Sequence, residues 1–462
     1  MINTPSLRGG CSSRRARNDG NSSMQTKTTR FFDLSAKIFF ALTILFIPFR
    51  WRLDLWIRPM PPLYSDYTNF QLFITDITLI YLLTFWACSL LLNPKKIKIG
   101  NLLIWICLVG LTIAGFISII GSVDAILSRY HVFRFILLLL LYLYIVNEVQ
   151  SPVWVIVPIA LQIIIQAPIA IGQFLAQSSL GLQAFGEHLL NPINAGTSII
   201  PIDGIRFLRA YGLSDHPNIL GGSIAFSLVI LFAIILYGKN RQPLFASIIF
   251  LISFPALMLT FSRSAWLSFG LATSLMVMSE AFARRWDSVK RASLLGVLSL
   301  FIMLPIVFEN ITLFEKRVAS VNATQDGPMI ERAYLIERGN ILFVEHSSVG
   351  IGLNAAPLAM KERFENFPGN FQPPHYVLLL VPLETGIVGG IFYLILFLMP
   401  LIFFIAKWKI YIHQPFVMGG FALIFAISIV SLFDYYTWYV TGRLWQWLAW
   451  GLFSVAIEKM SE

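Results

Sequence analysis

The chain has 462 residues, of which 57% are hydrophobic and only 13% are charged. Since a soluble domain usually carries about 25% charged residues, this composition excludes an ordinary soluble protein. The formal net charge of +10 does not indicate nucleic-acid binding, because no basic patch with interleaved aromatic residues lies outside the apolar segments.

The first 30 residues are polar and basic and contain no apolar stretch of their own. Such a composition cannot bury enough apolar surface to fold. Residues 1–30 are therefore predicted to be a disordered cytoplasmic tail rather than a cleaved signal peptide. Met24 is as good a candidate for the first residue as Met1.

Long apolar runs follow from residue 31 to the end of the chain. A run of about 18 or more apolar residues crosses the hydrocarbon core as a helix, whereas open-edged strands are excluded because lipid cannot pair with their backbone groups. The sequence therefore predicts an all-α integral membrane protein, with a polytopic membrane domain over residues 31–462 and about twelve transmembrane helices. The predicted spans are residues 32–49, 69–92, 101–121, 132–147, 153–175, 218–237, 244–261, 264–283, 294–309, 376–406, 416–433 and 444–457.

Basic residues between the spans set the predicted orientation. Four of the five even-numbered connections are basic. By the positive-inside rule these connections and both termini are cytoplasmic. Two long segments, about 176–217 and 309–375, then lie outside. Arg50, Arg52 and Arg58 fall on the same outer side, where they are predicted to be interfacial anchors.

The segment between spans nine and ten is too long to be a simple turn and is predicted to be a large, partly helical external loop. Within it, ERAYLIERGNILFVEH (Glu331–His346) has apolar residues at helical spacing and leads to a glycine-rich turn. MKERFENF (Met360–Phe367) is typical of a short amphipathic helix on a membrane surface. The loop is larger than a connection between two spans requires, which indicates a functional role at that surface.

Two arginines are candidate ligands for an anion. Arg209 lies in RFLRAYGLSDHPN, where HPN predicts a turn into a helix, and Arg263 interrupts about forty mostly apolar residues. Guanidinium groups on the outer face would attract phosphate. The alternatives are an ordinary loop-to-helix junction for Arg209 and a hairpin tip in water for Arg263. Additional candidates on the outer side are Arg206, Arg332, Arg338 and Arg443.

His375 is the candidate general base. It follows Pro-Pro at the start of a span, and histidine is the side chain best suited to exchange protons at neutral pH. The alternative is a polar residue at the membrane interface. Glu384 lies about two and a half helical turns deeper and is therefore not on the same face. The glycines of ETGIVGG (Glu384–Gly390) weaken that helix, and such breaks tend to line cavities.

The aromatic hairpin FDYYTWYVTGRLWQW (Phe433–Trp447) admits two interpretations. It is either an interfacial aromatic belt or a stacking surface for sugar rings or a lipid headgroup, with Asp434 and Arg443 as polar contacts. No metal or other cofactor is indicated. The three cysteines have neither CxxC nor zinc spacing, and the outer loops carry no DxD or paired-carboxylate signature.

Five stretches of the chain, in the order in which they occur, resemble the O-antigen ligase family, a set of bacterial membrane glycosyltransferases. The resemblance covers roughly residues 206–452. The family usually shows a His-Asn pair before an E-x-G-x-x-G stretch, and here Tyr376 stands in the place of the asparagine. The matching stretches are RAYGLSDHPN (Arg209–Asn218), TFSRSAWL (Thr260–Leu267), SSVGIGLN (Ser347–Asn354), PPHYVLLLVPLETGIVGG (Pro373–Gly390) and the ending FDYYTWYVTGRLWQWLAWGL.

The resemblance implies a fold like that of the membrane-embedded GT-C glycosyltransferases. It implies transfer of a glycan from undecaprenyl diphosphate to a glycan, lipid or protein hydroxyl at the outer face of the inner membrane, without a metal or a nucleotide sugar. Carried over to this chain, His375 is the catalytic histidine, and Arg209 and Arg263 bind the diphosphate. The implied partners are the lipid-linked glycan, the acceptor and membrane lipids, but not nucleic acid.

The same family pattern covers O-antigen ligases, O-antigen polymerases and protein O-oligosaccharyltransferases, which differ in their acceptors. The alternative class is a transporter or flippase of lipid-linked saccharides, which about twelve spans also fit. Against a transporter, the two halves show no repeat and the spans carry few charges that could couple an ion gradient.

Overall fold

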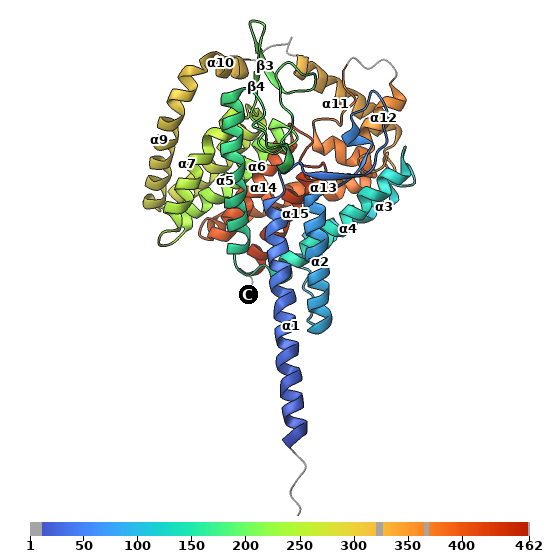
Figure 1. Ribbon diagram of the computed structural model, residues 1–462, viewed down its shortest axis with the longest axis vertical. Helices are drawn as coiled ribbons and strands as arrows, with labels where there is room; N and C mark the ends of the chain where they lie inside the picture. The colour runs from blue at the N-terminus through green and yellow to red at the C-terminus, as the bar shows by residue number, and fades with distance from the viewer. Residues whose placement is uncertain (1–11, 320–326, 365–368, 461–462) are drawn as a thin grey trace, which may run out of the picture.

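The computed structural model describes residues 12–319, 327–364 and 369–460, which form a bundle of helices capped at one end by shorter elements (Figure 1). The helices and strands, in chain order, are α1 (Ser12–Leu45), β1 (Arg52–Trp56), β2 (Phe70–Phe73), α2 (Ile74–Leu92), α3 (Leu102–Ile117), α4 (Ala125–Glu148), α5 (Val153–Ala176), β3 (Ile199–Ile202), β4 (Ile205–Leu208), α6 (Pro217–Tyr237), α7 (Gln242–Leu259), α8 (Arg263–Phe282), α9 (Trp286–Glu309), α10 (Ile311–Ala319), α11 (Gly327–Glu345), α12 (Ala356–Arg363), α13 (Val377–Tyr411), α14 (Pro415–Ser431) and α15 (Gly442–Glu458).

Each of the twelve predicted spans lies largely in one of these helices, α1–α9 or α13–α15. Among the described residues, eight helices are long and apolar enough to cross a membrane by length and composition: α2, α4, α5, α6, α7, α8, α9 and α13. Helices α3 and α14 are apolar but shorter. The prediction of a helical multi-pass membrane protein is therefore confirmed, while the number of about twelve spans and the GT-C likeness stay predictions.

The structure differs from the sequence prediction in two places. Two antiparallel hairpins, β1–β2 and β3–β4, were not predicted, because strands of four or five residues are too short to show a clear alternating pattern. Helix α1 begins at Ser12, so residues 12–30 are helical where a disordered tail was predicted. No proline interrupts this stretch, and a helix already nucleated in an apolar segment propagates at little cost. Residues 1–11 lie outside the described residues.

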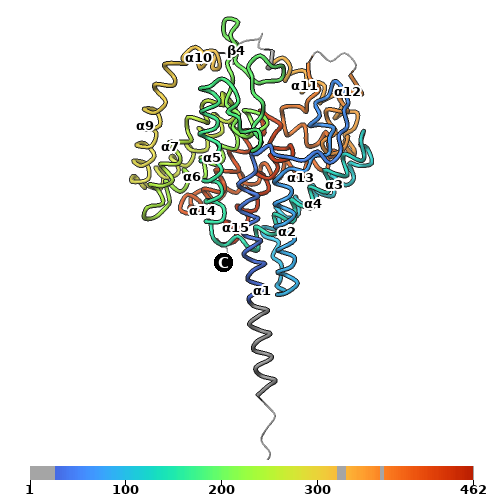
Figure 2. The backbone as a smooth tube through the Cα atoms, viewed as in Figure 1, coloured from blue at the N-terminus to red at the C-terminus, as the bar shows by residue number. Residues whose placement is uncertain are grey.

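The two long segments predicted to be external gather at the same end of the bundle (Figure 2). Hairpin β3–β4 and helices α10, α11 and α12 lie at this end, whereas α1 projects from the opposite end and α15 finishes there. The partly helical character predicted for the longer segment is confirmed by α10, α11 and α12. Helix α12 buries its first five residues against the protein, so only its end matches the predicted surface helix; residues 365–368 lie outside the described residues.

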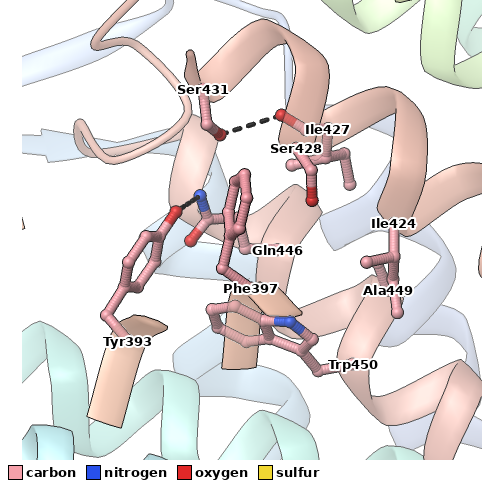
Figure 3. Close-up of a pocket in the computed structure, with 9 residues that line it drawn as sticks. All are labelled: Tyr393, Phe397, Ile424, Ile427, Ser428, Ser431, Gln446, Ala449 and Trp450. Atoms are coloured by element: carbon pink, nitrogen blue, oxygen red, sulfur yellow. Dashed lines mark hydrogen bonds between the residues drawn. The ribbon is translucent and has the colours of Figure 1, made fainter. Parts of the chain in front are cut away.

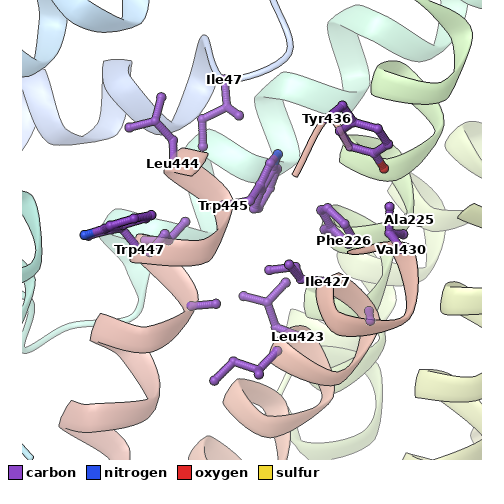
Figure 4. Packing of buried hydrophobic residues seen from close by; sticks show 14 of the residues in the cluster. Ile47, Ala225, Phe226, Leu423, Ile427, Val430, Tyr436, Leu444, Trp445 and Trp447 are labelled. Atoms are coloured by element: carbon purple, nitrogen blue, oxygen red, sulfur yellow. The ribbon is translucent and has the colours of Figure 1, made fainter. Parts of the chain in front are cut away.

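Helix α6 is at the centre of the bundle, where it packs against α5, α7, α8 and α14. Trp445 of α15 packs against Phe226 of α6, with ring centroids 5.6 Å apart (Figure 4). Close approach is possible because α6 carries glycine at position 222. A Cβ atom placed there would lie 1.5 Å from the hydroxyl oxygen of the buried Tyr436. The α14–α15 connection therefore rests directly on α6.

Replacing Gly222 by alanine should destabilise the protein, because the added methyl group must displace Tyr436 from a packed core. Overpacking of this kind costs about 1–3 kcal/mol. Thermal unfolding in detergent, followed by size-exclusion chromatography, would measure the effect. Gly270→Ala in α8 is the matched control, since a Cβ atom there meets nothing within 4 Å. Equal unfolding curves for the two variants would contradict the expectation.

Helix α13 is broken at Gly386, where φ is 73° and ψ is 173°. The helix weakening predicted for ETGIVGG is thus observed. Residues 347–352, which follow α11, occupy the break and exchange backbone hydrogen bonds with it. The amide nitrogens of Ile351 and Gly352 donate to the carbonyl oxygens of Leu383 and Glu384, at 3.0 and 3.1 Å. The amide of Ile387 donates to Ser347 at 2.8 Å, so the polar groups freed by the break are paired.

Candidate active site

His375 lies just before α13, in the cap at the end of the bundle that carries the long segments. Its side chain is 13% exposed, and Nδ1 lies 3.4 Å from Oδ1 of Asp434, an ion-pair distance without hydrogen-bond alignment. Nε2 lies 3.4 Å from the amide oxygen of Gln372. The ring meets the ring of Tyr435 edge-on, with centroids 4.7 Å apart. The histidine is therefore reachable from solvent and held from one side by a carboxylate and an aromatic ring.

Asp434 is the centre of this arrangement. It lies in the short connection between α14 and α15 and is 3% exposed. Its Oδ2 accepts a 2.8 Å hydrogen bond from the amide of Asn218 and lies 3.7 Å from the guanidinium of Arg332. Burial alone would raise the pKa of Asp434, but His375 and Arg332 outweigh it and hold this pKa below its usual value. The carboxylate therefore stays ionised at neutral pH.

Arg209 joins the same network through Asn218. The guanidinium of Arg209 donates from Nη2 to the side-chain oxygen of Asn218 at 2.6 Å. It also donates from Nε to the carbonyl of Thr260 and from Nη1 to the hydroxyl of Ser198, both at 2.8 Å. It is 5% exposed. Burial, and then the positive charge of Arg317, lower the pKa of Arg209 well below its usual value. An anion bound nearby would favour the charged form of Arg209.

The turn into α6 forms as predicted. His216 is the N-cap residue, its Nδ1 accepts from the backbone amide of Asn218 at 3.1 Å, and Pro217 is the first helical residue. Burial, and then Arg209, lower the pKa of His216 to about 3. A neutral His216 can accept this capping hydrogen bond, which places Asn218 between Arg209 and Asp434.

Arg263 begins α8, directly after the turn to which Arg209 is bonded. It is half-buried, and its guanidinium lies 3.6 Å from the sulfur of Met329 in α11. Arg317 of α10 donates from Nε to the carbonyl of Phe261 in the same turn, at 2.7 Å. The three arginines are thus attached to one turn at the start of a helix, where the helix dipole adds further positive potential.

The other candidates divide into two groups. Arg332 and Asp434 belong to what we call the polar network, which consists of Arg209, Asn218, Asp434, Arg332 and His375. Arg206, Arg338 and Arg443 make contacts elsewhere: Arg206 is exposed on β4, Arg338 lies over the ring of Phe364, and Arg443 is buried at 3.8 Å from Glu384.

Sequence reasoning missed several residues of the site. Asn218 lies in the motif RAYGLSDHPN, but nothing in that motif indicates that it bonds Arg209 and Asp434. Arg317 is one of several arginines in the outer segments. Nothing in the local sequence indicates that Tyr435 meets the ring of His375 or that Tyr67 bonds Tyr435.

The three arginines expected to be interfacial anchors are instead paired within the protein. Arg52 donates to both carboxylate oxygens of Asp215 at 2.7 Å, and Arg50 donates to the same carboxylate at 3.1 Å. Arg58 donates to Asp124 at 2.6 Å. Their charge is therefore neutralised by carboxylates brought close by the fold.

A small pocket lies inside the bundle, apart from the polar network. Nine residues of α13, α14 and α15 line it, among them Tyr393, Ser431 and Gln446 (Figure 3). Its cavity volume is about 10 Å³, enough for roughly one water molecule and too small for a sugar. In the part of the chain that the structure describes, no group of three or more His, Cys, Asp or Glu side chains could hold a metal ion.

Part of the chain resembles a known protein family. Residues 248–394 match the family model described as O-antigen ligase. This stretch includes Arg263, Arg332, His375 and the break in α13, but neither Arg209 nor Asp434. No curated protein matches the chain. The family match confirms the resemblance that the sequence motifs indicated.

Proposed function

We propose that this chain, a member of the O-antigen ligase family, transfers a glycan from an undecaprenyl-diphosphate carrier to an acceptor hydroxyl. It would act as a ligase or polymerase of a lipid-linked polysaccharide, at the outer face of the cytoplasmic membrane and with both termini in the cytoplasm. The observation that carries the proposal is the polar network. It joins a solvent-reachable histidine to a set of arginines through one buried carboxylate and one amide.

His375 is the general base of the proposed reaction. Transfer forms a bond between the acceptor oxygen and the anomeric carbon of the glycan, while the bond from that carbon to the diphosphate breaks. The acceptor proton passes to His375, and the electron pair of the broken bond leaves with the diphosphate. Asp434 beside Nδ1 favours the tautomer with its proton on that nitrogen, which leaves the lone pair of Nε2 to accept the proton of the acceptor hydroxyl. Asp434 thus orients the ring of His375.

The arginines stabilise the diphosphate leaving group. Negative charge grows on the diphosphate as the bond to carbon breaks, and guanidinium groups stabilise such charge when they are already positioned. Arg332, with 27% of its side chain exposed, and Arg263 are the accessible members of the set. Arg209 is committed to three protein acceptors and contributes mainly by its charge and by holding the turn before Arg263.

The test of this function is transfer by the purified protein in detergent micelles. Micelles have no compartments, so a transporter produces no measurable change there. A glycosyltransferase, in contrast, forms and breaks covalent bonds. With lipid-linked glycan extracted from the host membranes and acceptor from the same cells, the acceptor should gain the mass of the glycan, and undecaprenyl diphosphate should be released. If the folded protein transfers nothing in micelles but moves the lipid-linked glycan across proteoliposomes, it is a transporter.

A further inference from the structure

The connection between α1 and α2, residues Arg50–Phe73, is part of the wall of the candidate site. It is fixed to the rest of the protein by the ion pairs of Arg50 and Arg52 with Asp215, next to the cap of α6. A further ion pair, between Arg58 and Asp124, fixes it to the start of α4. This connection lies outside the stretch matched by the family model.

A third attachment leads directly to His375. The hydroxyl groups of Tyr67 and Tyr435 are 2.9 Å apart, and it is the ring of Tyr435 that meets the imidazole edge-on. Tyr439 closes the stack, since its ring lies 5.6 Å from the rings of both Tyr67 and Tyr435. These rings are largely buried and offer little surface to a ligand.

Tyr64 continues this stack to the surface. Its ring lies 6.2 Å from that of Tyr67, at an angle of 65°, yet Tyr64 is 43% exposed. Burial, and then the nearby carboxylate of Glu331, raise the pKa of Tyr64. Glu331 also accepts a 2.9 Å hydrogen bond from the backbone amide of Asn370, in the segment that leads to His375.

We propose that Tyr64 is a stacking surface for a sugar ring of the substrate glycan at the mouth of the site. The proposal rests on the function proposed above. A tyrosine offers a large, rigid apolar face and a polar tip, which suits a pyranose ring that presents C–H groups on one face and hydroxyl groups around its edge. Glu331 and Arg332, neighbours in α11, would supply the acceptor and the donors for those hydroxyls. The sugar belongs either to the donor or to the acceptor glycan.

Binding and kinetics together test the proposal. The probes are the lipid-linked glycan extracted from the host membranes and the oligosaccharide that mild acid releases from it. Tyr64→Ala should weaken binding of the oligosaccharide to the detergent-solubilised protein about tenfold, the scale of one well-packed aromatic contact. Tyr64→Phe keeps the ring and should bind almost normally. Tyr81→Ala is the control, because Tyr81 is 50% exposed on α2, within a candidate membrane span.

The kinetic arm identifies the source of the sugar. A raised KM for the lipid-linked glycan with an unchanged KM for the acceptor assigns the ring to the donor, and the reverse result assigns it to the acceptor. Binding and both KM values unchanged in Tyr64→Ala would overturn the proposal, as would absence of oligosaccharide binding to the wild-type protein. A wild-type protein that binds the oligosaccharide through Tyr64 but transfers nothing would instead overturn the proposed function alone.

Discussion

Replacing His375 by alanine should lower the rate of glycan transfer by about a hundredfold or more, the usual scale for a positioned acid–base group. The acceptor hydroxyl is a poor nucleophile until a base removes its proton, and the imidazole is the solvent-reachable base of the polar network. Binding of the lipid diphosphate should survive, because the arginines remain. The measurement is the transfer rate in detergent micelles at equal amounts of folded protein, together with binding of the lipid-linked glycan.

Two further variants sharpen this test. Asp434→Asn keeps the shape of the side chain but removes the charge that orients His375, so transfer should fall by a smaller factor than in His375→Ala. His346→Ala is the control, because that histidine is half-buried at the end of α11 and is not part of the polar network. A His375→Ala protein with near-normal transfer would refute the role of the histidine and leave only the arginine half of the mechanism.

Replacing Arg209 by lysine should impair both transfer and stability. The guanidinium satisfies three buried acceptors, on Thr260, Ser198 and Asn218, and a single ammonium group cannot reach all of them. Each lost hydrogen bond to a buried charged group costs about 1.5–3 kcal/mol. The turn before Arg263 and the amide of Asn218 would both shift, so we expect at least a tenfold lower rate of transfer and a lower unfolding temperature.

Arg206→Lys provides the matched control for this change. It is the same substitution three residues earlier, but Arg206 is exposed on β4 and donates to the carbonyl of Asn194 at 3.5 Å. Transfer and thermal unfolding should be unaffected there. Normal transfer and a normal unfolding temperature in Arg209→Lys would show that Arg209 neither holds the turn nor contributes to the site.

The membrane helices could be predicted from the sequence because each depends on a local property, the length of an apolar run. The same holds for the cap of α6, since His216, Pro217 and Asn218 act on neighbouring backbone. The break in α13 was also foreseen from glycines close together in the chain. The hairpins were not, because β1 and β2 are joined by a long connection and have only four or five residues each.

The partners within the site could not be predicted, since they depend on contacts between distant parts of the chain. Asn218 and Asp434 are 216 residues apart in the sequence, and Arg52 and Asp215 are 163 residues apart. The sequence around an arginine does not show which carboxylate the fold brings to it. For the same reason, the contact between His375 and Asp434 could not be predicted.

The hydrogen bonds between α13 and residues 347–352 have a consequence for the long outer segment. A helix break inside a membrane normally needs water or a neighbouring helix to pair its backbone groups, each of which costs several kcal/mol when left unpaired in lipid. In this protein, residues 347–352 provide the hydrogen-bond partners for the amide of Ile387 and the carbonyls of Leu383 and Glu384. The loop and the span are therefore coupled through these three hydrogen bonds, and a substitution in SSVGIGLN that displaces the loop would leave backbone groups of α13 unpaired.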